Sequence, residues 1–393
     1  MSDGKHALIF GATGISGWSL MNQCLSYPSP TTFSRITGLC NRPTRKEDLF
    51  LPEDNGRINI VSGIDLTAPV DTVIRGLSKI EEISSVDVVF FCAYIQTPDF
   101  ESLRKANTAI LHTAVSAITS LAPNLSTVIL QTGGKGYGLE FPDKVAITPP
   151  LHEDMPRIPE PYASKIFYYP QHDLLANLSE KEDIRWTFSE IRPDGIVGFA
   201  PGSNAMNMAQ GIAFYLSLYR EVNGKDAAVP FPGSRKGYRS THSDTFQDVL
   251  SKVEIHVALN RDKCANGSVF NAADGKTVTW EMVWPGVCEW FGLKGVPPTG
   301  GSEGESIQSF VDGHMTEWSS LVNRLGLKEG MVEKQGWGHT HFMLVDFDFN
   351  REYALDKIRD AGFTDWIDTV QGYKVAFQRM VEARLIPSPA SFA

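Results

Sequence analysis

The sequence predicts an α/β protein, a doubly wound parallel sheet of the Rossmann type with a smaller, mostly C-terminal lobe. Three observations support this fold class. An apolar run near the start is followed at once by the glycine-punctuated stretch Phe10-Gly11-Ala12-Thr13-Gly14-Ile15-Ser16-Gly17. Apolar, β-rich runs then alternate with longer helical stretches, which is typical of βαβ units. The chain has 393 residues, of which 42% are hydrophobic, enough for one large domain or two fused ones.

The order of the elements follows from these runs. Further strands are expected at 35–40, 58–62, 86–92, 126–132, 185–191 and 268–271, and helices at 16–27, 70–77, 100–121 and 168–178. After Pro193 the pattern loosens, with helices expected at 205–219 and 279–291, an aromatic-rich loop at 337–342 and a surface loop at 297–302. We therefore expect a nucleotide-binding domain at 1–198, to which 240–275 return, and a partly discontinuous substrate lobe at 199–239 and 276–393.

The glycine-punctuated stretch reads as strand, tight turn and helix, which is a dinucleotide-binding fingerprint. Gly11 permits the sharp turn, Gly14 lets the backbone approach a pyrophosphate, and Gly17 brings the helix against the strand. The N-terminus of the helix then offers unpaired N–H donors to the anion. The spacing is the variant usual in short-chain dehydrogenases. The alternative is a plain turn between a strand and a helix.

Composition excludes several function classes. The net charge of −10 argues against a nucleic-acid or anionic-membrane surface. Five scattered cysteines without metal-ligand spacing indicate reduced thiols. The first five residues are too short and polar for a signal peptide, and no apolar run approaches the roughly 18 residues of a membrane span. We expect a cytoplasmic protein. His339 and His341 suggest a metal, but no third ligand is apparent, and a strand edge or loop is favoured.

Cationic residues follow the second expected strand, at Asn41-Arg42-Pro43-Thr44-Arg45. An NAD-preferring fold would place an acidic residue here for the ribose 2′-hydroxyl. Arg42 and Arg45 instead stand where a 2′-phosphate would lie, and a guanidinium binds phosphate through two hydrogen bonds. Each could also be a solvated loop cation. Asp65 and Leu66 follow the third strand, where an Asp commonly meets the adenine amino group. The alternative for Asp65 is a helix cap.

Two further motifs carry candidate chemistry. Lys135 stands among glycines in Gln131-Thr132-Gly133-Gly134-Lys135-Gly136-Tyr137, directly after the expected fifth strand. Tyr168 and Tyr169 open a helix, with Pro170 in its first turn, where proline is tolerated. A short-chain dehydrogenase usually has Tyr-x-x-x-Lys here, but the residue four after Tyr168 is His172. Tyr162 and Lys165 are only three apart and precede the helix, so they are taken as a decoy.

Together these motifs resemble the progesterone 5β-reductase/iridoid synthase-like family, an atypical branch of the extended short-chain dehydrogenases. In that family Thr-Gly-x-Lys-His-Tyr replaces the usual serine region, and Asn-Phe-Tyr-Tyr supplies the tyrosine. The corresponding stretches here are Thr132-Gly133-Gly134-Lys135-Gly136-Tyr137 and Ile166-Phe167-Tyr168-Tyr169. The likeness also covers the glycine turn, Arg42, the loop at 191–199 and the helix start at 203–207.

The resemblance implies NADPH-dependent reduction, often of a carbon–carbon double bond conjugated to a carbonyl. Tyr168 would donate to the carbonyl oxygen, with Tyr169 as the competing assignment. Lys135 would hold the ribose and lower the pKa of the tyrosine. The expected cofactor-binding residues are Gly11, Thr13, Gly14, Ile15, Gly17, Asn41, Arg42, Asp65, Leu66, Ala93, Thr132, Ile196 and Val197.

Departures from the family pattern leave the substrate open. Gly136 replaces the family histidine, Gly138 often a bulkier residue, and His172 a glutamate. A small hydrophobic substrate is expected against Tyr137, Met206, Phe214 and Phe342, with Tyr215 and Trp337 adding apolar surface. The alternatives are a simple ketone or imine reductase and a non-redox NADP-binding isomerase, cyclase or sensor. A homodimer is compatible with the sequence.

Overall fold

The computed structural model describes residues 4–202, 204–299 and 306–392. Within these ranges a parallel sheet of seven strands has the order β10-β6-β5-β4-β1-β2-β3. Its strands are β1 Lys5–Phe10, β2 Phe33–Cys40, β3 Ile58–Ser62, β4 Val88–Phe91, β5 Thr127–Gln131, β6 Thr187–Pro193 and β10 Ser268–Ala272. The chain order reverses between β1 and β4, so the predicted doubly wound fold is confirmed.

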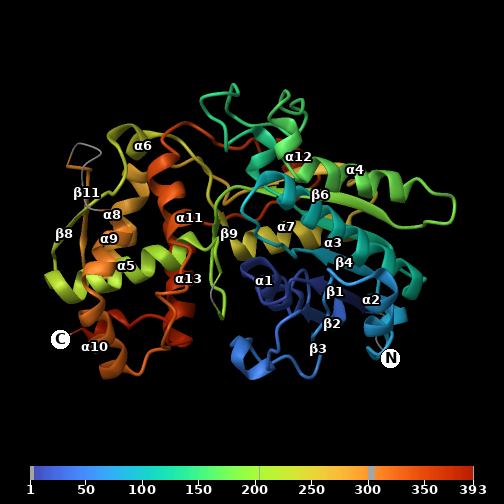
Figure 1. The fold of residues 1–393 in the computed structure, drawn as a ribbon, viewed down its shortest axis with the longest axis horizontal. Coiled ribbons are helices and arrows are strands. Elements are labelled where there is room, and N and C mark those ends of the chain that lie inside the picture. Colours follow the sequence, from blue (N-terminus) through green and yellow to red (C-terminus); the bar gives the residue numbers. More distant parts are fainter. Residues whose placement is uncertain (1–3, 203, 300–305, 393) are drawn as a thin grey trace.

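Helices cover both faces of the sheet, as Figure 1 shows. One face is packed by α1 Ile15–Cys24 and α7 Gln247–Leu259, and the other by α2 Val70–Leu77, α3 Phe100–Leu121 and α4 Tyr168–Ser179. Successive strand side chains point to opposite faces. Accordingly, Ala7 and Ile9 of β1 belong to one apolar cluster and Leu8 and Phe10 to the other. Burial on both sides explains why the strands read as continuous apolar runs.

The second lobe lies to the left in Figure 1. Its helices are α5 Met208–Asn223, α6 Arg235–Arg239, α8 Trp280–Trp290, α9 Ile307–Gly313, α10 Met315–Leu325, α11 Trp337–His341 and α13 Thr369–Glu382. Two short parallel pairs join β8 Ala228–Pro230 to β11 Lys294–Val296, and β7 Ile196–Val197 to β9 Thr245–Phe246. Helix α12, Asp356–Asp360, contacts β10. Large aromatic side chains fill the lobe, and Trp280 and Trp284 are almost fully buried.

The expected elements agree closely with the observed ones. Each of the six further strands ends within two residues of its expected bounds, and α2 and α3 match theirs. The helix expected at 205–219 begins only at Met208, because the Asn207 carboxamide accepts a hydrogen bond from the Gln210 N–H and caps it. Segment 247–272 lies with the sheet, through α7 against α1 and β10 beside β6. The exact domain boundaries stay a prediction.

One expected element of secondary structure was wrong. Residues 337–342 were expected as a loop, and His339 and His341 at a strand edge or loop, but α11 spans Trp337–His341 and a π-helical turn follows at Phe342–Asp346. Close packing on α5 explains the helix, since a methyl group on Gly211 would lie 2.2 Å from the Thr340 hydroxyl oxygen. Residues 1–3, Ser203 and residues 300–302, which carry parts of three expectations, lie outside the described residues.

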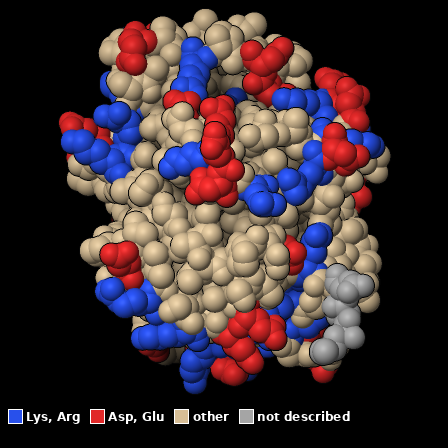
Figure 2. Space-filling view, turned by 90° about the vertical axis from the view of Figure 1, so that its right-hand side faces the viewer, with Lys and Arg blue, Asp and Glu red and all other residues tan. Residues whose placement is uncertain are grey.

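No helix among the described residues is long and apolar enough to cross a membrane. Figure 2 shows the face formed by the sheet domain, and there Lys and Arg side chains are interspersed with Asp and Glu. On that face the described residues form no continuous basic surface.

Candidate active site

The residues predicted for the site come together at the carboxyl edge of the sheet. The loops after β1, β2, β3, β4, β5 and β6 begin there, and they carry the glycine turn, Arg42, Asp65, Ala93, Lys135 and Ile196. Open α/β sheets bind ligands at this edge, where the strand order reverses. The fold therefore places six separate sequence motifs along one edge of the sheet.

The glycine turn has the geometry that a dinucleotide requires. Gly11 has a φ of +85°, and a methyl group on it would lie 2.9 Å from the Ala93 backbone nitrogen. A methyl group on Gly17 would lie 2.3 Å from the Gly11 carbonyl oxygen, so only glycine lets α1 approach the turn. Helix α1 begins at Ile15. It has no side-chain cap at Gly14 and no acidic residue in its first turn. Its first N–H groups are therefore suited to an anion, next to Thr13.

The two arginines after β2 have different surroundings. Arg45 donates to both carboxylate oxygens of Asp48, at 2.9 and 2.8 Å, and is occupied within its own loop. Arg42 and its neighbour Asn41 are exposed, and the Arg42 guanidinium has no hydrogen-bond or ion-pair partner among the described residues. Of the two cations, Arg42 is the one available to a phosphate.

Asp65 is held in a turn at the end of β3. Its Oδ1 accepts hydrogen bonds from the Thr67 N–H and hydroxyl, at 2.9 and 2.7 Å, which lowers the pKa of the carboxyl. Helix α2 starts later, with Pro69 at its N-cap, so Asp65 is not a helix cap. The role of Asp65 and the half-buried Leu66 toward adenine stays a prediction.

Lys135 lies in a short 3₁₀ turn, Gly134–Tyr137, after β5. Its ammonium donates to Glu140 Oε1 at 2.7 Å, and both side chains are about one-fifth exposed. His339 of α11 lies close enough to Lys135 for the two side chains to interact electrostatically. Burial, with the Lys135 charge adding, lowers the pKa of His339 to about 4. The charge of a lysine of the sheet domain therefore acts on an imidazole of the second lobe.

Tyr168 begins α4 and is 8% exposed. A methyl group on Gly133 would lie 3.4 Å from its hydroxyl oxygen and 3.3 Å from the Pro193 carbonyl oxygen, so this hydroxyl lies where the β5 and β6 loops meet. The Tyr168 hydroxyl makes no hydrogen bond with the described residues. Its ring packs on Phe167, with ring centroids 4.3 Å apart, and Lys135 lies 5.9 Å from the Phe167 centroid.

The charge of Lys135 does not lower the pKa of Tyr168, contrary to the expectation from sequence. Burial raises this pKa, and the negative charges of Glu140 and Glu190 raise it further. Because Lys135 is paired with Glu140, its field toward the phenol is offset. In the chain alone, Tyr168 is a neutral hydrogen-bond donor.

Tyr169 differs from Tyr168 in its hydrogen bonding. Its hydroxyl donates to the Gly136 carbonyl oxygen at 2.7 Å and accepts from the Ile158 N–H at 3.1 Å. The Arg157 guanidinium lies 4.8 Å from the centre of its ring. Tyr169 therefore fixes the turn that carries Lys135, and its hydroxyl is not free for a ligand.

Two other predicted residues are tied into the protein. The Thr132 hydroxyl donates to Glu190 Oε1 at 2.8 Å. The Tyr137 hydroxyl donates to Asn271 Oδ1 at 2.7 Å, and its ring meets Tyr353 edge-on at 5.6 Å. Their hydroxyls are thus engaged, although backbone and ring surface near them can still line a site. Ile196 and Val197 form β7, next to the loop after β6.

The predicted substrate residues of the second lobe are not all in one place. Phe214 is 1% exposed and packs edge-on against Trp318 at 5.5 Å, so it lies in the core of the lobe and offers no open surface. Met206 and Phe342 are half-buried. Phe342 lies in the π-helical turn, and its ring packs at a tilt against that of Phe347, with ring centroids 4.3 Å apart. This placement gives no support to Phe214 as a substrate residue.

The second lobe directly contacts loops at the carboxyl edge of the sheet. A methyl group on Gly195, in the loop after β6, would lie 2.6 Å from Met343 Cε in the π-helical turn. A methyl group on Gly14 would lie 3.8 Å from the Asn204 amide nitrogen, just ahead of α5. The lobe therefore borders the glycine turn and the loop after β6.

Sequence reasoning missed Glu140, Tyr94 and Glu190. Tyr94 follows β4, its hydroxyl donates a hydrogen bond to Gln96 Oε1, and its ring packs against Phe167, next to Tyr168. Glu190 and Arg192 could have been noticed, because charged residues are unusual in a strand buried on both faces. Glu140 stands in a loop and had no such signal.

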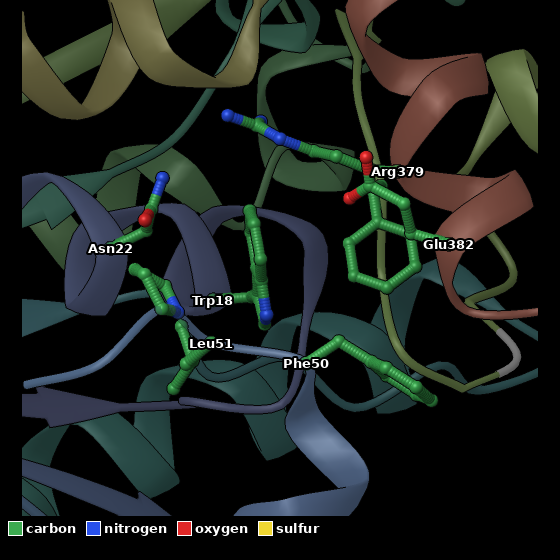
Figure 3. A pocket seen from close by; sticks show the side chains of 8 residues that line it. Trp18, Asn22, Phe50, Leu51, Arg379 and Glu382 are labelled. Carbon is green, nitrogen blue, oxygen red and sulfur yellow. The ribbon is translucent and has the colours of Figure 1, made fainter.

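A cavity of about 250 Å³ lies outside this constellation (Figure 3). It lies between α1, the segment after β2, the segment after β7 and α13. Its lining residues are Trp18, Asn22, Phe50, Leu51, Pro52, Phe199, Arg379 and Glu382. The Arg379 guanidinium is already paired with both oxygens of Asp248, at 2.8 and 2.6 Å. None of the predicted site residues lines this cavity. Among the described residues no group of three or more His, Cys, Asp or Glu could hold a metal ion.

A doubly wound sheet with this turn at β1, a lysine after β5 and a tyrosine at the start of α4 defines a dehydrogenase of the short-chain type. Residues 7–387 match the model of the PRISE-like Rossmann-fold domain, and the chain belongs to that family.

Relatives and solved structures agree with this class. The chain is 36% identical to the short chain dehydrogenase ausT of Aspergillus calidoustus, over 98% of this chain and 94% of that protein. It is 27% identical to the 3-oxo-Delta(4,5)-steroid 5-beta-reductase of Arabidopsis thaliana, over 94% and 92%. The fold is similar to that of Bordetella bronchiseptica WbmF in complex with NAD+, with a TM-score of 0.56 and 14% identity over 96% and 93%. The chain is an oxidoreductase of the short-chain dehydrogenase type.

Proposed function

We propose that this protein is an NADPH-dependent reductase of a small hydrophobic enone, in which Tyr168 donates a hydrogen bond to the carbonyl oxygen as negative charge develops there. One observation carries the proposal. Tyr168 presents a nearly buried hydroxyl without a protein hydrogen-bond partner among the described residues, at the carboxyl edge of a dinucleotide-binding sheet. The adjacent Tyr169 has both hydroxyl functions engaged, which supports Tyr168 as the donor.

The residues present fit a nicotinamide dinucleotide. Side chains at Gly11 and Gly17 would collide with backbone atoms, and the uncapped start of α1 suits a pyrophosphate. The exposed, unpaired Arg42 favours the 2′-phosphate of NADPH over the free hydroxyl of NADH. When bound, this cofactor supplies the hydride. We assign Lys135 to its ribose.

The protonation state of Tyr168 bears on which bond is reduced. A raised pKa makes the phenol a poor proton donor in the full-transfer sense, but it leaves a neutral O–H able to hydrogen-bond. An enolate oxygen is stabilised by such a donor without receiving the proton. An alkoxide formed from a ketone must be protonated to give the product. A neutral O–H donor of this kind is sufficient for conjugate reduction, with hydride added at the β-carbon.

The relatives support the same reading. The name of the plant relative gives it a 3-oxo-Δ4,5 steroid substrate, which is a conjugated enone. The fungal relative is named as a short chain dehydrogenase. In this chain, apolar surface of the second lobe at Met206 and Phe342, and the rings of Phe167 and Tyr94 beside Tyr168, suit a small apolar molecule. We propose a role in specialised metabolism.

The test follows deuterium from labelled NADPH into the product, over a panel of enones, ketones and imines. We expect label on the carbon β to the carbonyl. Label on the carbinol or amine carbon would identify a ketone or imine reductase instead. Absence of transfer to every member of the panel, with NADPH binding retained, would favour a non-redox isomerase, cyclase or sensor.

A further inference from the structure

A single buried carboxylate links the segments that carry the candidate site. Glu190 lies on β6 with 1% of its surface exposed. Its Oε1 accepts hydrogen bonds from the Thr132 hydroxyl at 2.8 Å and from Arg192 Nε at 2.7 Å. Its Oε2 lies 2.7 Å from His172 Nδ1. A buried charge is tolerated only when it is paired and hydrogen-bonded, and both oxygens of Glu190 are.

The partners of Glu190 belong to different elements of the site. Thr132 directly follows β5, three residues before Lys135. His172 follows Tyr168 by four residues on α4, and residues so spaced share one face of a helix. Arg192 precedes Pro193, whose carbonyl oxygen lies beside the Gly133–Tyr168 contact. One carboxylate therefore contacts the lysine segment, the tyrosine helix and the end of its own strand β6.

Charge and stacking reinforce this arrangement. Burial alone would raise the pKa of Glu190, but Arg192 and His172 lower it to about 2, so the group is a carboxylate at neutral pH. The Arg192 guanidinium lies 5.1 Å from the centre of the Tyr137 ring, in the same turn as Lys135. The His172 ring meets Phe188 of β6 edge-on at 5.1 Å. The contact thus extends from the lysine turn to α4.

We propose that Glu190 is a positioning residue for the reaction, and that through His172 it fixes the orientation of the Tyr168 hydroxyl relative to the Lys135 turn. The inference rests on the proposed function, because it assigns Glu190 a role through Tyr168. His172 occupies the helical position at which a usual short-chain dehydrogenase has its lysine. Here the residue at that position links α4 to Glu190 of β6.

The test uses His172, because removal of Glu190 would leave Arg192 unpaired in the interior and would destabilise the fold. His172→Phe keeps a ring against Phe188 but removes the group that meets Glu190 Oε2. His172→Gln keeps an N–H donor. The matched control is Asp173→Asn, the next residue of α4, which breaks an exposed ion pair with Arg157. All variants are compared in the full chain below their melting temperatures.

We expect His172→Phe to lower kcat about 10- to 100-fold, as small misplacements of reacting groups do, with the Kd for NADPH changed less than twofold. His172→Gln should recover most of the lost kcat, and Asp173→Asn should keep that of the unaltered protein. In the Tyr168→Phe background, His172→Phe should cause little further loss, since both changes act through one hydroxyl.

Two results would overturn the proposal. One is an unchanged kcat in His172→Phe. The other is a full additional loss of kcat in the Tyr168→Phe background, which is the result expected of a purely structural role. If Tyr168→Phe itself keeps the full kcat, the proposed function of Tyr168 fails. If Tyr168→Phe is slow and His172→Phe is not, only the Glu190 inference fails.

Discussion

Two neighbouring tyrosines at the start of α4 have the same side-chain chemistry but different hydrogen bonding. The Tyr169 hydroxyl is bonded to the Gly136 carbonyl and the Ile158 N–H, whereas the Tyr168 hydroxyl has no protein partner among the described residues. A donor already satisfied by protein gains little from a ligand, because binding must first break an existing hydrogen bond. Availability, rather than residue type, therefore separates the two.

Replacement of Tyr168 by Phe should slow turnover of an enone by about 10²–10³, the range for loss of one oxyanion donor. For a ketone the loss should be larger, because the alkoxide must also receive a proton. Steady-state rates on both substrate classes measure this. Tyr169→Phe is the control. It should lower the melting temperature and change kcat little. Equal rates for Tyr168→Phe and the unaltered protein would contradict the assignment.

Arg42→Ala should weaken NADPH binding by about 1.5–3 kcal/mol, the range for hydrogen bonds to charged groups, and leave NADH binding nearly unchanged. Arg45→Ala is the matched control and should have little effect on either cofactor, because Arg45 is paired with Asp48. Titration calorimetry with both cofactors provides the measurement. Equal affinities of the unaltered protein for NADPH and NADH would be inconsistent with a 2′-phosphate site at Arg42.

At the scale of elements, the turn from β1 into α1 combines two constraints that different glycines satisfy. Gly17 permits contact between α1 and the turn, since its hydrogen faces the Gly11 carbonyl oxygen. Gly14 has an ordinary φ of −78°, and a methyl group there would lie 3.4 Å from the same oxygen. We therefore expect folding to depend on Gly17 and the approach of a phosphate to depend on Gly14.

Substitution of the two glycines by alanine should separate these effects. Gly17→Ala places a methyl group 2.3 Å from a carbonyl oxygen and should destabilise the protein by about 1–3 kcal/mol, as overpacking does. Gly14→Ala should keep the melting temperature but weaken NADPH binding. Urea unfolding and cofactor titration test the pair. Gly202→Ala, with open space around it, is the neutral control. A stable Gly17→Ala protein would be evidence against the close contact.

At the scale of the whole molecule, a buried acid on α7 links stability to pH. Glu254 is fully buried, and neither of its carboxylate oxygens has a hydrogen-bond partner among the described residues. Burial raises the pKa of its carboxyl to about 8. The folded chain therefore holds a proton on Glu254 that the unfolded chain, whose carboxyl titrates at about 4.3, has already released. Stability contributed in this way is present below that lower pKa and is lost as pH rises.

We expect the free energy of unfolding to fall between about pH 4.5 and pH 8, by up to about 1.4 kcal/mol per pH unit from this one proton. Glu254→Gln should make the slope in this window shallower, while buried Asp244, whose pKa burial raises to about 7, still contributes a slope of the same sign. Glu254→Gln should also be more stable than the unaltered protein at pH 8. Exposed Glu333→Gln should change neither. Denaturant unfolding from pH 5 to pH 8.5 gives the comparison. A Glu254→Gln profile parallel to that of the unaltered protein would show that Glu254 does not carry the slope.

The sequence by itself determined the fold class, the glycine turn, most strand and helix positions and the family. These depend on periodicity, turn residues and motif spacing, which are local properties of the chain. It also predicted Tyr168 as the donor to the carbonyl oxygen and Lys135 as the residue that holds the ribose, and both assignments stay predictions. The expectation of a loop at 337–342 was wrong. Helix α11 forms there because it packs against Gly211 of α5, far away in the sequence.

Only the tertiary structure decided which polar groups are free. Thr132 and Glu190 are 58 residues apart in the chain, and no local pattern predicts their hydrogen bond. The same holds for Tyr169 and Ile158, and for Tyr137 and Asn271, 134 residues apart. A hydrogen bond depends on the position and direction of two atoms, and the fold sets both for residues distant in sequence. Local pattern therefore identified the candidate residues, and long-range pairing determined which of their side chains remain available to a ligand.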